Sequence, residues 1–278
     1  MSDVDIAVVI PVYNASKTII RALDGVFSQT LLPAEVLLIN DGSQDDSLDI
    51  INNSKYKDLV TLITIENSGP ANARNVGIRT AKSKWIAFLD ADDQWILNDK
   101  LEKQLALAES DQSIVLVDTF AKVYWNKSKT IDVTRVKSGK MFNHFLYQNI
   151  INATSSVLAK RASIAEVGYF DATIKFGEDR LLWALLAKKG NIATVTDFSV
   201  YKENHDANLT SKGEENFKYR KLLVSKLLSV SALSDKKVAE VKLANFEDFL
   251  MLGYRNRDPK LYRKFAHRAF SATGKTFL

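Results

Sequence analysis

The chain has 278 residues, of which 46% are hydrophobic and 26% are charged, values typical of a globular protein and not of a disordered or fibrous one. It contains no cysteine, which excludes disulfide frameworks, thiolate nucleophiles and cysteine-bound metal centres. The net charge is +5, but residues 218–278 hold 14 Lys and Arg against 5 Asp and Glu. A basic C-terminal region on a mildly acidic body suggests an anionic partner for that region.

The first 90 residues repeat a strand–helix unit. Residues 6–12 form a continuous apolar, β-branched run, the pattern of a strand buried on both faces. Similar patterns predict further strands at 35–40, 60–66 and 85–89, and helices that open at Ser16 and span 45–53 and 70–81. This alternation with short connections predicts parallel strands joined by right-handed crossovers, and hence an open α/β sheet.

Polar residues follow each of the four predicted strands. They are Tyr13-Asn14, Asp41-Gly42-Ser43, Asn67-Ser68-Gly69-Pro70 and Asp90-Ala91-Asp92-Asp93. In open α/β sheets, ligands bind beyond the carboxyl ends of the strands. Any one of these loops has the composition of an ordinary turn or helix cap. Four of them at one edge of the sheet predict a ligand site.

The chain lacks the glycine spacing of a dinucleotide fingerprint and the full Gly-x4-Gly-Lys-Ser/Thr pattern of a P-loop. A phosphorylated ligand would therefore depend on carboxylates and a metal ion. Asp90 and Asp92 have the spacing for this, since Mg²⁺ prefers carboxylate oxygens together with substrate phosphates. Asp3 and Asp5 share that spacing, so the position of Asp90 and Asp92 directly after an apolar strand is what distinguishes them.

Seven segments together resemble the ordered motifs of family 2 glycosyltransferases. They are Val9-Ile-Pro-Val-Tyr-Asn14, Asn40-Asp-Gly-Ser43, Asn67 to Gly77, Phe88-Leu-Asp-Ala-Asp-Asp93, Asn152-Ala-Thr-Ser-Ser156, Val167-Gly-Tyr-Phe-Asp171 and Gly177-Glu-Asp-Arg-Leu-Leu-Trp183. The resemblance covers about residues 5–210. It implies the GT-A fold, an open mixed sheet with helices on both faces, and transfer from a nucleotide-sugar donor with inversion at the anomeric carbon.

The resemblance also implies a role for each matching residue. Donor-binding residues would be Pro11, Tyr13, Asn14, Asp41, Arg74 and Asp90, with Tyr13 and Asn14 bordering the base, Asp41 accepting a hydrogen bond from it, and Arg74 near the diphosphate. Asp92, together with Asp90, would bind Mg²⁺ or Mn²⁺. His205 lies in a segment similar to one in which a late histidine approaches the metal or diphosphate, although a lone histidine is more often structural.

Asp179 matches the general base of the family. The attacking sugar hydroxyl must lose its proton, and a carboxylate within reach contributes about 10²- to 10⁴-fold. The alternative is that Asp179 only caps the apolar helical stretch that begins at Leu181. Family members often carry a second Asp where Leu181 stands, and Arg180 places a cation beside the base, which favours the ionised form.

The C-terminal region predicts a basic amphipathic helix after Asp258-Pro259. Its charged face would hold Lys260, Arg263, Lys264, His267 and Arg268. Such a helix can lie on an anionic membrane, or it can pack its aromatic face on the domain beside predicted helices at 214–234 and 235–255. We expect a GT-A domain at 1–212 and a basic helical extension at 213–278.

The sequence thus predicts an inverting, metal-dependent hexosyl- or N-acetylhexosaminyltransferase. A UDP-sugar would be the donor and a saccharide or lipid-linked molecule the acceptor, in the biosynthesis of a surface polysaccharide such as a capsule or lipopolysaccharide. The acidic N-terminus lacks a secretory signal, so we expect a cytoplasmic protein, peripheral at the inner face of the membrane if the basic helix binds it. A non-catalytic sugar-binding pseudo-transferase is the alternative. A nucleotidyltransferase would need a Gly-rich signature near the first strand, and a nucleic-acid-binding protein would need a recognised motif; the sequence offers neither.

Overall fold

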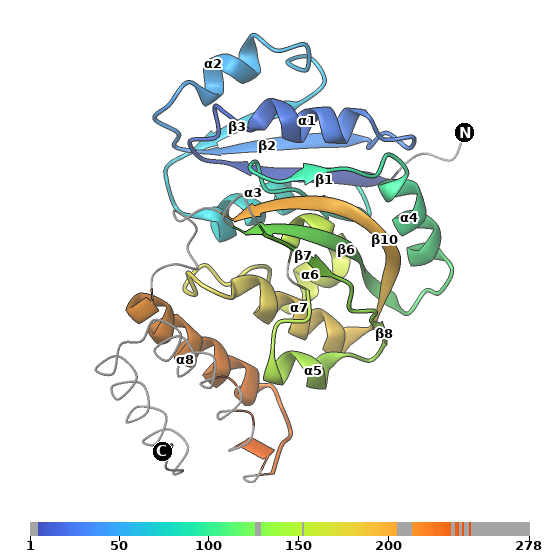
Figure 1. Cartoon of the computed structure of the whole chain (residues 1–278). Helices are drawn as coiled ribbons and strands as arrows, with labels where there is room; N and C mark the ends of the chain where they lie inside the picture. The colour runs from blue at the N-terminus through green and yellow to red at the C-terminus, as the bar shows by residue number, and fades with distance from the viewer. Residues whose placement is uncertain are drawn as a thin grey trace.

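The structure, a computed structural model, describes residues 5–125, 129–151, 153–204 and 213–234, together with residues 237, 238, 241 and 245. Helices and strands alternate through the first half (Figure 1). In chain order the elements are β1 (Ile6–Val12), α1 (Ile19–Phe27), β2 (Glu35–Asp41), α2 (Ser47–Asn52), β3 (Thr61–Ile65), α3 (Pro70–Thr80), β4 (Trp85–Phe88), β5 (Gln94–Trp95), α4 (Lys100–Glu109), β6 (Ile114–Trp125), β7 (Lys129–Val133), β8 (Ser138–Gly139), α5 (Phe142–Tyr147), η1 (Thr154–Ser156), β9 (Leu158–Lys160), α6 (Arg161–Val167), α7 (Glu178–Lys189), β10 (Asn191–Asn204) and α8 (Gly213–Ser229).

The strands form one mixed sheet in the order β3-β2-β1-β4-β9-β6-β10-β5, with β7 beside β6 and β8 beside β10. The pairs within β3-β2-β1-β4 are parallel, and so is β6 with β10. β9 runs antiparallel to both β4 and β6 and joins the two parallel halves. The expected open mixed α/β sheet is therefore confirmed.

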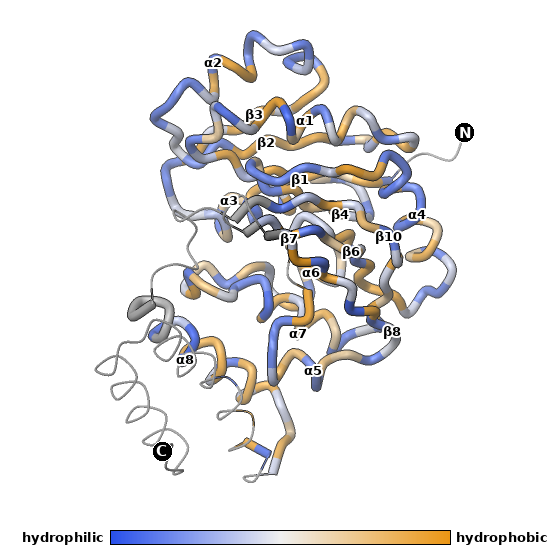
Figure 2. The backbone as a smooth tube through the Cα atoms, in the orientation of Figure 1, coloured by the Kyte–Doolittle hydropathy of each residue, from blue (hydrophilic) through white to orange (hydrophobic). Residues whose placement is uncertain are grey.

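Two hydrophobic cores cover the two faces of the sheet. β1 shows why, since its alternate residues belong to different cores: Ala7 and Val9 to one, Ile6, Val8 and Ile10 to the other. The first core is completed by α3, α5, α6 and α7, and the second by α1, α2 and α4. Figure 1 shows α1 and α3 on opposite sides of β1, and Figure 2 shows apolar residues along β1 and β2 between these layers.

The predicted elements of the first half are present, with small shifts at their ends. The strand at 6–12 is observed without change as β1. The helix expected to open at Ser16 begins at Ile19, because Thr18 N donates to Ala15 O in a turn that precedes it. The helix expected from Asp45 begins at Ser47, after a turn in which the Asp45 carboxylate accepts a hydrogen bond from the Ser47 backbone N at 3.1 Å.

Helix α3 lies unusually close to β1 at Gly77. A Cβ atom added at Gly77 would lie 2.4 Å from Val9 Cγ1, well inside contact distance. The absence of a side chain here allows α3, which also carries Arg74, to pack closely on the sheet.

We expect Gly77→Ala to lower the free energy of unfolding by about 1–3 kcal/mol, as overpacking of a buried contact does. Urea unfolding would measure this, with Thr80→Ala as a control on an exposed position of the same helix. The control should change stability by less than about 0.5 kcal/mol. An equal result for the two variants would mean that Val9 moves aside without cost.

Helix α8 packs against the core on the α7 side of the sheet. Its residues Leu223 and Leu227 are buried in the same cluster as Leu182 and Leu186. The predicted helix 214–234 thus corresponds to α8, which ends at Ser229. The predicted helix 235–255 lies mostly outside the described residues, and the basic helix after Pro259 lies wholly outside them. The proposed boundary at 212/213 remains a prediction. Among the described helices, none has the length and apolar character that crossing a membrane requires.

Candidate active site

The loops after β1 and β2 are joined at the carboxyl edge of the sheet. Asn14 N donates to Ser43 Oγ at 3.1 Å, and Gln44 N donates back to Asn14 Oδ1 at 2.8 Å. Asn14 has a positive φ of 49°, a conformation that asparagine tolerates better than most residues. Its neighbour Tyr13 is 50% exposed, so an aromatic ring stands free at this edge.

Asp41, at the end of β2, holds the loop that precedes α3. Its Oδ1 accepts hydrogen bonds from Ser68 N at 2.8 Å and Ser68 Oγ at 3.2 Å, and its Oδ2 accepts one from Gly69 N at 2.8 Å. The side chain is buried. The predicted hydrogen bond from a nucleotide base to Asp41 would therefore use carboxylate lone pairs that these bonds do not occupy.

Three carboxylates gather directly after β4. Asp90, Asp92 and Asp93 each place an oxygen within 4.8 Å of the others. Asp93 is 1% exposed, and its Oδ1 is buried with no hydrogen-bond partner among the described residues. Burial raises the pKa of Asp93, and the charges of Asp90 and Asp92 raise it further. A hard divalent cation would satisfy the orphaned oxygen and offset the repulsion, so this donor set fits such an ion.

Arg74, on α3, joins the acidic cluster to the start of α7. Its Nη2 lies 2.6 Å from Asp90 Oδ1, and its Nη1 lies 3.2 Å from Glu178 Oε1. Burial would lower the pKa of Arg74, but the charges of Asp90 and Glu178 outweigh burial and raise it. The pKa of Asp90 is raised by burial and lowered more strongly by Arg74 and Lys202, so the net shift is downward. Asp90 is therefore ionised at neutral pH.

Lys202, on β10, is a second cation at the cluster. Tyr201 pairs with Gln94 in antiparallel register, and continuing that register places Lys202 beside Asp93. The charge of Asp93 raises the pKa of Lys202 above its ordinary value, burial opposes this, and Asp90 and Asp92 add to the rise. Lys202 thus balances part of the negative charge of the three carboxylates.

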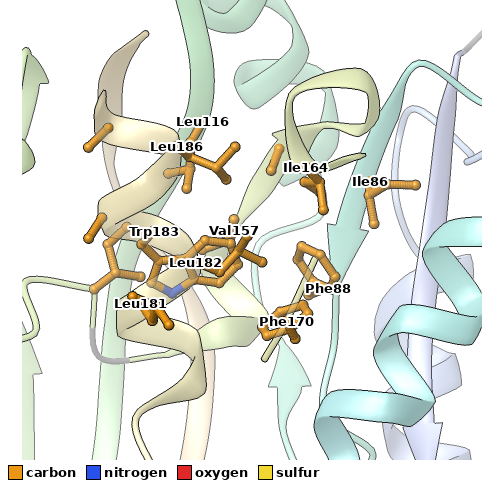
Figure 3. Packing of buried hydrophobic residues seen from close by; sticks show 14 of the residues in the cluster. Ile86, Phe88, Leu116, Val157, Ile164, Phe170, Leu181, Leu182, Trp183 and Leu186 are labelled. Carbon is orange, nitrogen blue, oxygen red and sulfur yellow. The ribbon is translucent and has the colours of Figure 1, made fainter. Parts of the chain in front are cut away.

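Helix α7 begins at the site and is anchored by an aromatic cluster beneath it. Gly177 has φ 86° and precedes the acidic first turn, while Lys188 and Lys189 occupy the last turn, so both ends complement the helix dipole. Trp183 packs with Phe88 and Phe170 at ring-centroid distances of 5.8 and 5.7 Å (Figure 3). These contacts tie the start of α7 to β4, which carries the acidic cluster at its end.

Asp179 is oriented by two hydrogen bonds. Its Oδ2 accepts from Asn149 Nδ2 at 3.1 Å, and its Oδ1 accepts from Arg180 N at 2.7 Å. The amide of Asn149 is itself fixed, since its Oδ1 accepts from Ile151 N at 3.2 Å. The charge of Asp179 also contributes to the raised pKa of Arg74 and Lys202, which indicates that the carboxylate faces the same site.

Beside it, Glu178 is paired with Arg74 and is largely buried. Burial raises the pKa of Glu178, the charge of Asp179 raises it further, and Arg74 opposes both. The site thus holds two adjacent carboxylates in different settings, one paired with a guanidinium and one held by neutral donors.

An acidic cluster, an arginine paired with it and the adjacent pair Glu178 and Asp179 thus lie close together, and the family model for Glycosyl transferase family 2 matches residues 7–171. The chain belongs to this family. An uncharacterized glycosyltransferase of Rickettsia felis is 35% identical over 199 residues, which are 70% of this chain and 32% of that protein. The chain spans only about a third of the length of the rickettsial relatives it matches first.

Three proteins whose names or structures include a sugar donor also match. The Escherichia coli protein WfaP, named as a UDP-Glc:alpha-D-GlcNAc-diphosphoundecaprenol beta-1,3-glucosyltransferase, is 29% identical over 66% of this chain and 71% of its own. The crystal structure of S. aureus TarS with UDP-GlcNAc has a TM-score of 0.73 at 19% identity, over 96% of this chain and 81% of that one. A mannosyltransferase of Pyrobaculum calidifontis with GDP-Man and Mn²⁺ has a TM-score of 0.66 at 18% identity, over 96% and 80%. At these identities, the likeness to the two structures shows only that this chain shares their fold, the GT-A fold.

Most of the site residues expected for a family 2 glycosyltransferase lie at one edge of the sheet in this structure. Asp90 and Asp92 belong to the acidic cluster, Arg74 pairs with Asp90, and Asp179 directly follows Glu178, the second partner of Arg74. Pro11, Tyr13, Asn14 and Asp41 lie at the ends of the neighbouring β1 and β2. His205, the remaining candidate metal ligand, lies outside the described residues.

Several residues at this candidate site were not predicted from the sequence. Asp93, Glu178 and Ser155 stand within quoted motifs, but only the fold shows what they contact. Lys202 lies three residues before His205, and a lone cation in a polar segment carries little signal. Asn149 falls outside every motif, so nothing in the sequence linked it to Asp179.

Proposed function

We propose that the chain is an inverting, metal-dependent glycosyltransferase that uses a UDP-sugar donor. The observation that supports this most directly is the acidic cluster of Asp90, Asp92 and Asp93, with its buried, unpartnered Asp93 oxygen, at the same sheet edge as Arg74 and Asp179. A donor with a diphosphate needs a cation site, and an attacking hydroxyl needs a base across from it. The site has residues for both.

The residues divide the reaction between them. Asp92, with Asp90 and Asp93, would hold Mg²⁺ or Mn²⁺, which when bound stabilises the charge that develops on the departing diphosphate. Tyr13 and Asn14 would border the base, and Arg74 keeps Asp90 ionised for its task. Asp179 would accept the proton of the attacking sugar hydroxyl. Attack from the face opposite the leaving group in one displacement gives inversion.

The proposed donor and acceptor rest on the relatives. WfaP is named for UDP-Glc and a diphosphoundecaprenol-linked acceptor, and TarS was solved with UDP-GlcNAc. On this support, we propose that the chain is a hexosyl- or N-acetylhexosaminyltransferase that extends a saccharide or a lipid-linked acceptor in surface polysaccharide biosynthesis. The basic region after residue 218 would contact the anionic membrane that carries such an acceptor, at its cytoplasmic face.

The test is calorimetric titration of UDP, GDP and dTDP, each with Mn²⁺ and with EDTA, on the wild type and on Asp92→Ala. We expect UDP to bind only with Mn²⁺ and the substitution to weaken binding about tenfold or more, since a direct ligand is lost. Asp111→Ala is a matched control. Asp111 is exposed just before β6 begins, at the opposite edge of the sheet from the cluster.

The other outcomes of this titration distinguish the alternatives. Tighter binding of GDP or dTDP would keep the family and overturn the UDP-sugar donor. Binding that is equal in EDTA would overturn the metal dependence. No nucleotide binding under any condition would favour the non-catalytic pseudo-transferase.

A further inference from the structure

A single buried hydroxyl connects the two ends of the acidic loop. Ser155, in η1, is fully buried, and its Oγ accepts a hydrogen bond from Asp90 N at 3.0 Å. The same Oγ donates to Asp93 Oδ2 at 2.5 Å. A serine hydroxyl has one proton to donate, so this bond uses it fully on Asp93. The backbone at one end of the loop and the carboxylate at the other are therefore held by one atom.

The segment that carries Ser155 is fixed from the other side. Trp95 Nε1, just after the loop, donates to Ser155 O at 2.8 Å. Gln104 Nε2, from α4, donates to Ser156 O at 2.8 Å and to Val117 O at 2.9 Å. Gln104 in turn accepts from Lys100 Nζ at 2.7 Å. Because the serine main chain is held on two sides, the hydroxyl position is set by the scaffold and not by the loop.

The bond to Ser155 also selects which oxygen of Asp93 is available. With Oδ2 occupied by the hydroxyl, Oδ1 is the oxygen without a hydrogen-bond partner among the described residues. Outer partners that orient ligating carboxylates are a general feature of metal sites, and their loss costs about 10- to 100-fold in metal affinity.

We propose that Ser155 is a positioning residue that presets the Asp90–Asp93 loop for a divalent cation. This inference rests on the proposed metal-dependent function. Ser155 does not touch the cation itself; it acts through the Asp90 backbone and the Asp93 carboxylate. The Asn152 to Ser156 motif thereby gains a role that its sequence did not indicate.

The experiment measures the affinity for Mn²⁺ itself, by electron paramagnetic resonance of the free ion during titration, with and without UDP. Wild type, Ser155→Ala, Ser156→Ala and Asp92→Ala are compared. Ser156 is the matched control, because it is equally buried in the same turn and its Oγ donates only to Ala153 O, at 2.7 Å. We expect the Kd for Mn²⁺ to rise about 10- to 100-fold in Ser155→Ala and to stay within about twofold of wild type in Ser156→Ala.

Urea unfolding of the metal-free proteins shows whether the effect is merely structural. Similar losses of stability in Ser155→Ala and Ser156→Ala, with weakened Mn²⁺ binding only in the first, support positioning. Equal Mn²⁺ affinities in the two variants overturn it. Should Ser155→Ala not fold, Ser155→Cys keeps the size of the side chain with a weak donor and acceptor, and the same comparison applies.

The controls separate this inference from the proposed function. If wild type does not bind Mn²⁺, with or without UDP, the metal-dependent function fails. If wild type binds Mn²⁺, Asp92→Ala does not, and Ser155→Ala binds like wild type, then the function stands and the role of Ser155 is refuted.

Discussion

Replacing Asp179 with asparagine is expected to lower kcat by about 10²- to 10⁴-fold while the affinity for UDP and Mn²⁺ stays unchanged. Asparagine has nearly the same shape, and one oxygen remains to accept a hydrogen bond from Asn149 or from Arg180 N. It cannot take a proton from the attacking hydroxyl. A fall in kcat without a change in binding would therefore separate the chemical step from donor recognition.

This prediction is tested by single-turnover transfer to a lipid-linked saccharide acceptor beside calorimetric titration of UDP with Mn²⁺. Glu166→Gln is the control, since that carboxylate is exposed on α6 and pairs only loosely with Lys189, at 3.7 Å. If Asp179→Asn keeps kcat within about threefold of wild type, Asp179 is not the base. The same measurement on Glu178→Gln would then show whether the neighbouring carboxylate serves instead.

Breaking the buried ion pair between Lys137 and Asp118 is expected to lower the free energy of unfolding strongly. The two side chains are 1% and 2% exposed, and Asp118 Oδ1 also accepts from Thr194 Oγ1 at 2.6 Å. Lys137→Met would leave a buried carboxylate without its cation, a change that costs about 3–5 kcal/mol. Urea unfolding at pH 8 measures it. Lys84→Met, which breaks an exposed pair with Glu109, should cost less than about 1 kcal/mol.

The loss of stability in Lys137→Met should be smaller at acidic pH. The direction of this pH dependence follows from the pKa of Asp118. Burial raises this pKa to about 6 even with Lys137 opposing it, whereas an unfolded aspartate titrates near 3.9. Between these values the folded state binds more protons, so stability falls as the pH rises. Without Lys137 the pKa of Asp118 in the folded state rises further, so stability falls with pH over a wider range. A loss of equal size at pH 5 and pH 8 would contradict this account.

The first half of the fold could be predicted closely because its signals are local. The run at 6–12 is apolar at every position, so a strand buried on both faces is its natural outcome, and β1 has these bounds. The second half could not be predicted in this way. β9 has only three residues, and its place between β4 and β6 depends on pairing with strands far away in sequence. No periodicity within the segment carries that information.

The residues of the candidate site also differ in whether local sequence signals could predict them. The position of Asp90 and Asp92 at the edge of the sheet could be predicted, since two carboxylates that follow an apolar strand are visible in the sequence. The pairing of Asp90 with Arg74 could not be predicted from spacing, because Arg74 lies 16 residues before Asp90 and 104 residues before Glu178, its second partner. Ser155 and Asn149 act through hydrogen bonds whose geometry exists only in the folded chain.

The residue directly after Asp179, the proposed base, is linked by hydrogen bonds to the end of the described chain. Arg180 is 1% exposed; its Nε donates to Phe145 O at 2.7 Å and its Nη1 donates to Asn245 Oδ1 at 2.7 Å. Asn245 also donates to Leu146 O at 2.8 Å. A protein that ends before residue 245 would lose one hydrogen-bond acceptor of this buried guanidinium, next to the proposed base Asp179. Engineering that swaps C-terminal segments between relatives, in the hope of exchanging acceptors, must therefore carry an asparagine or an equivalent acceptor at this position.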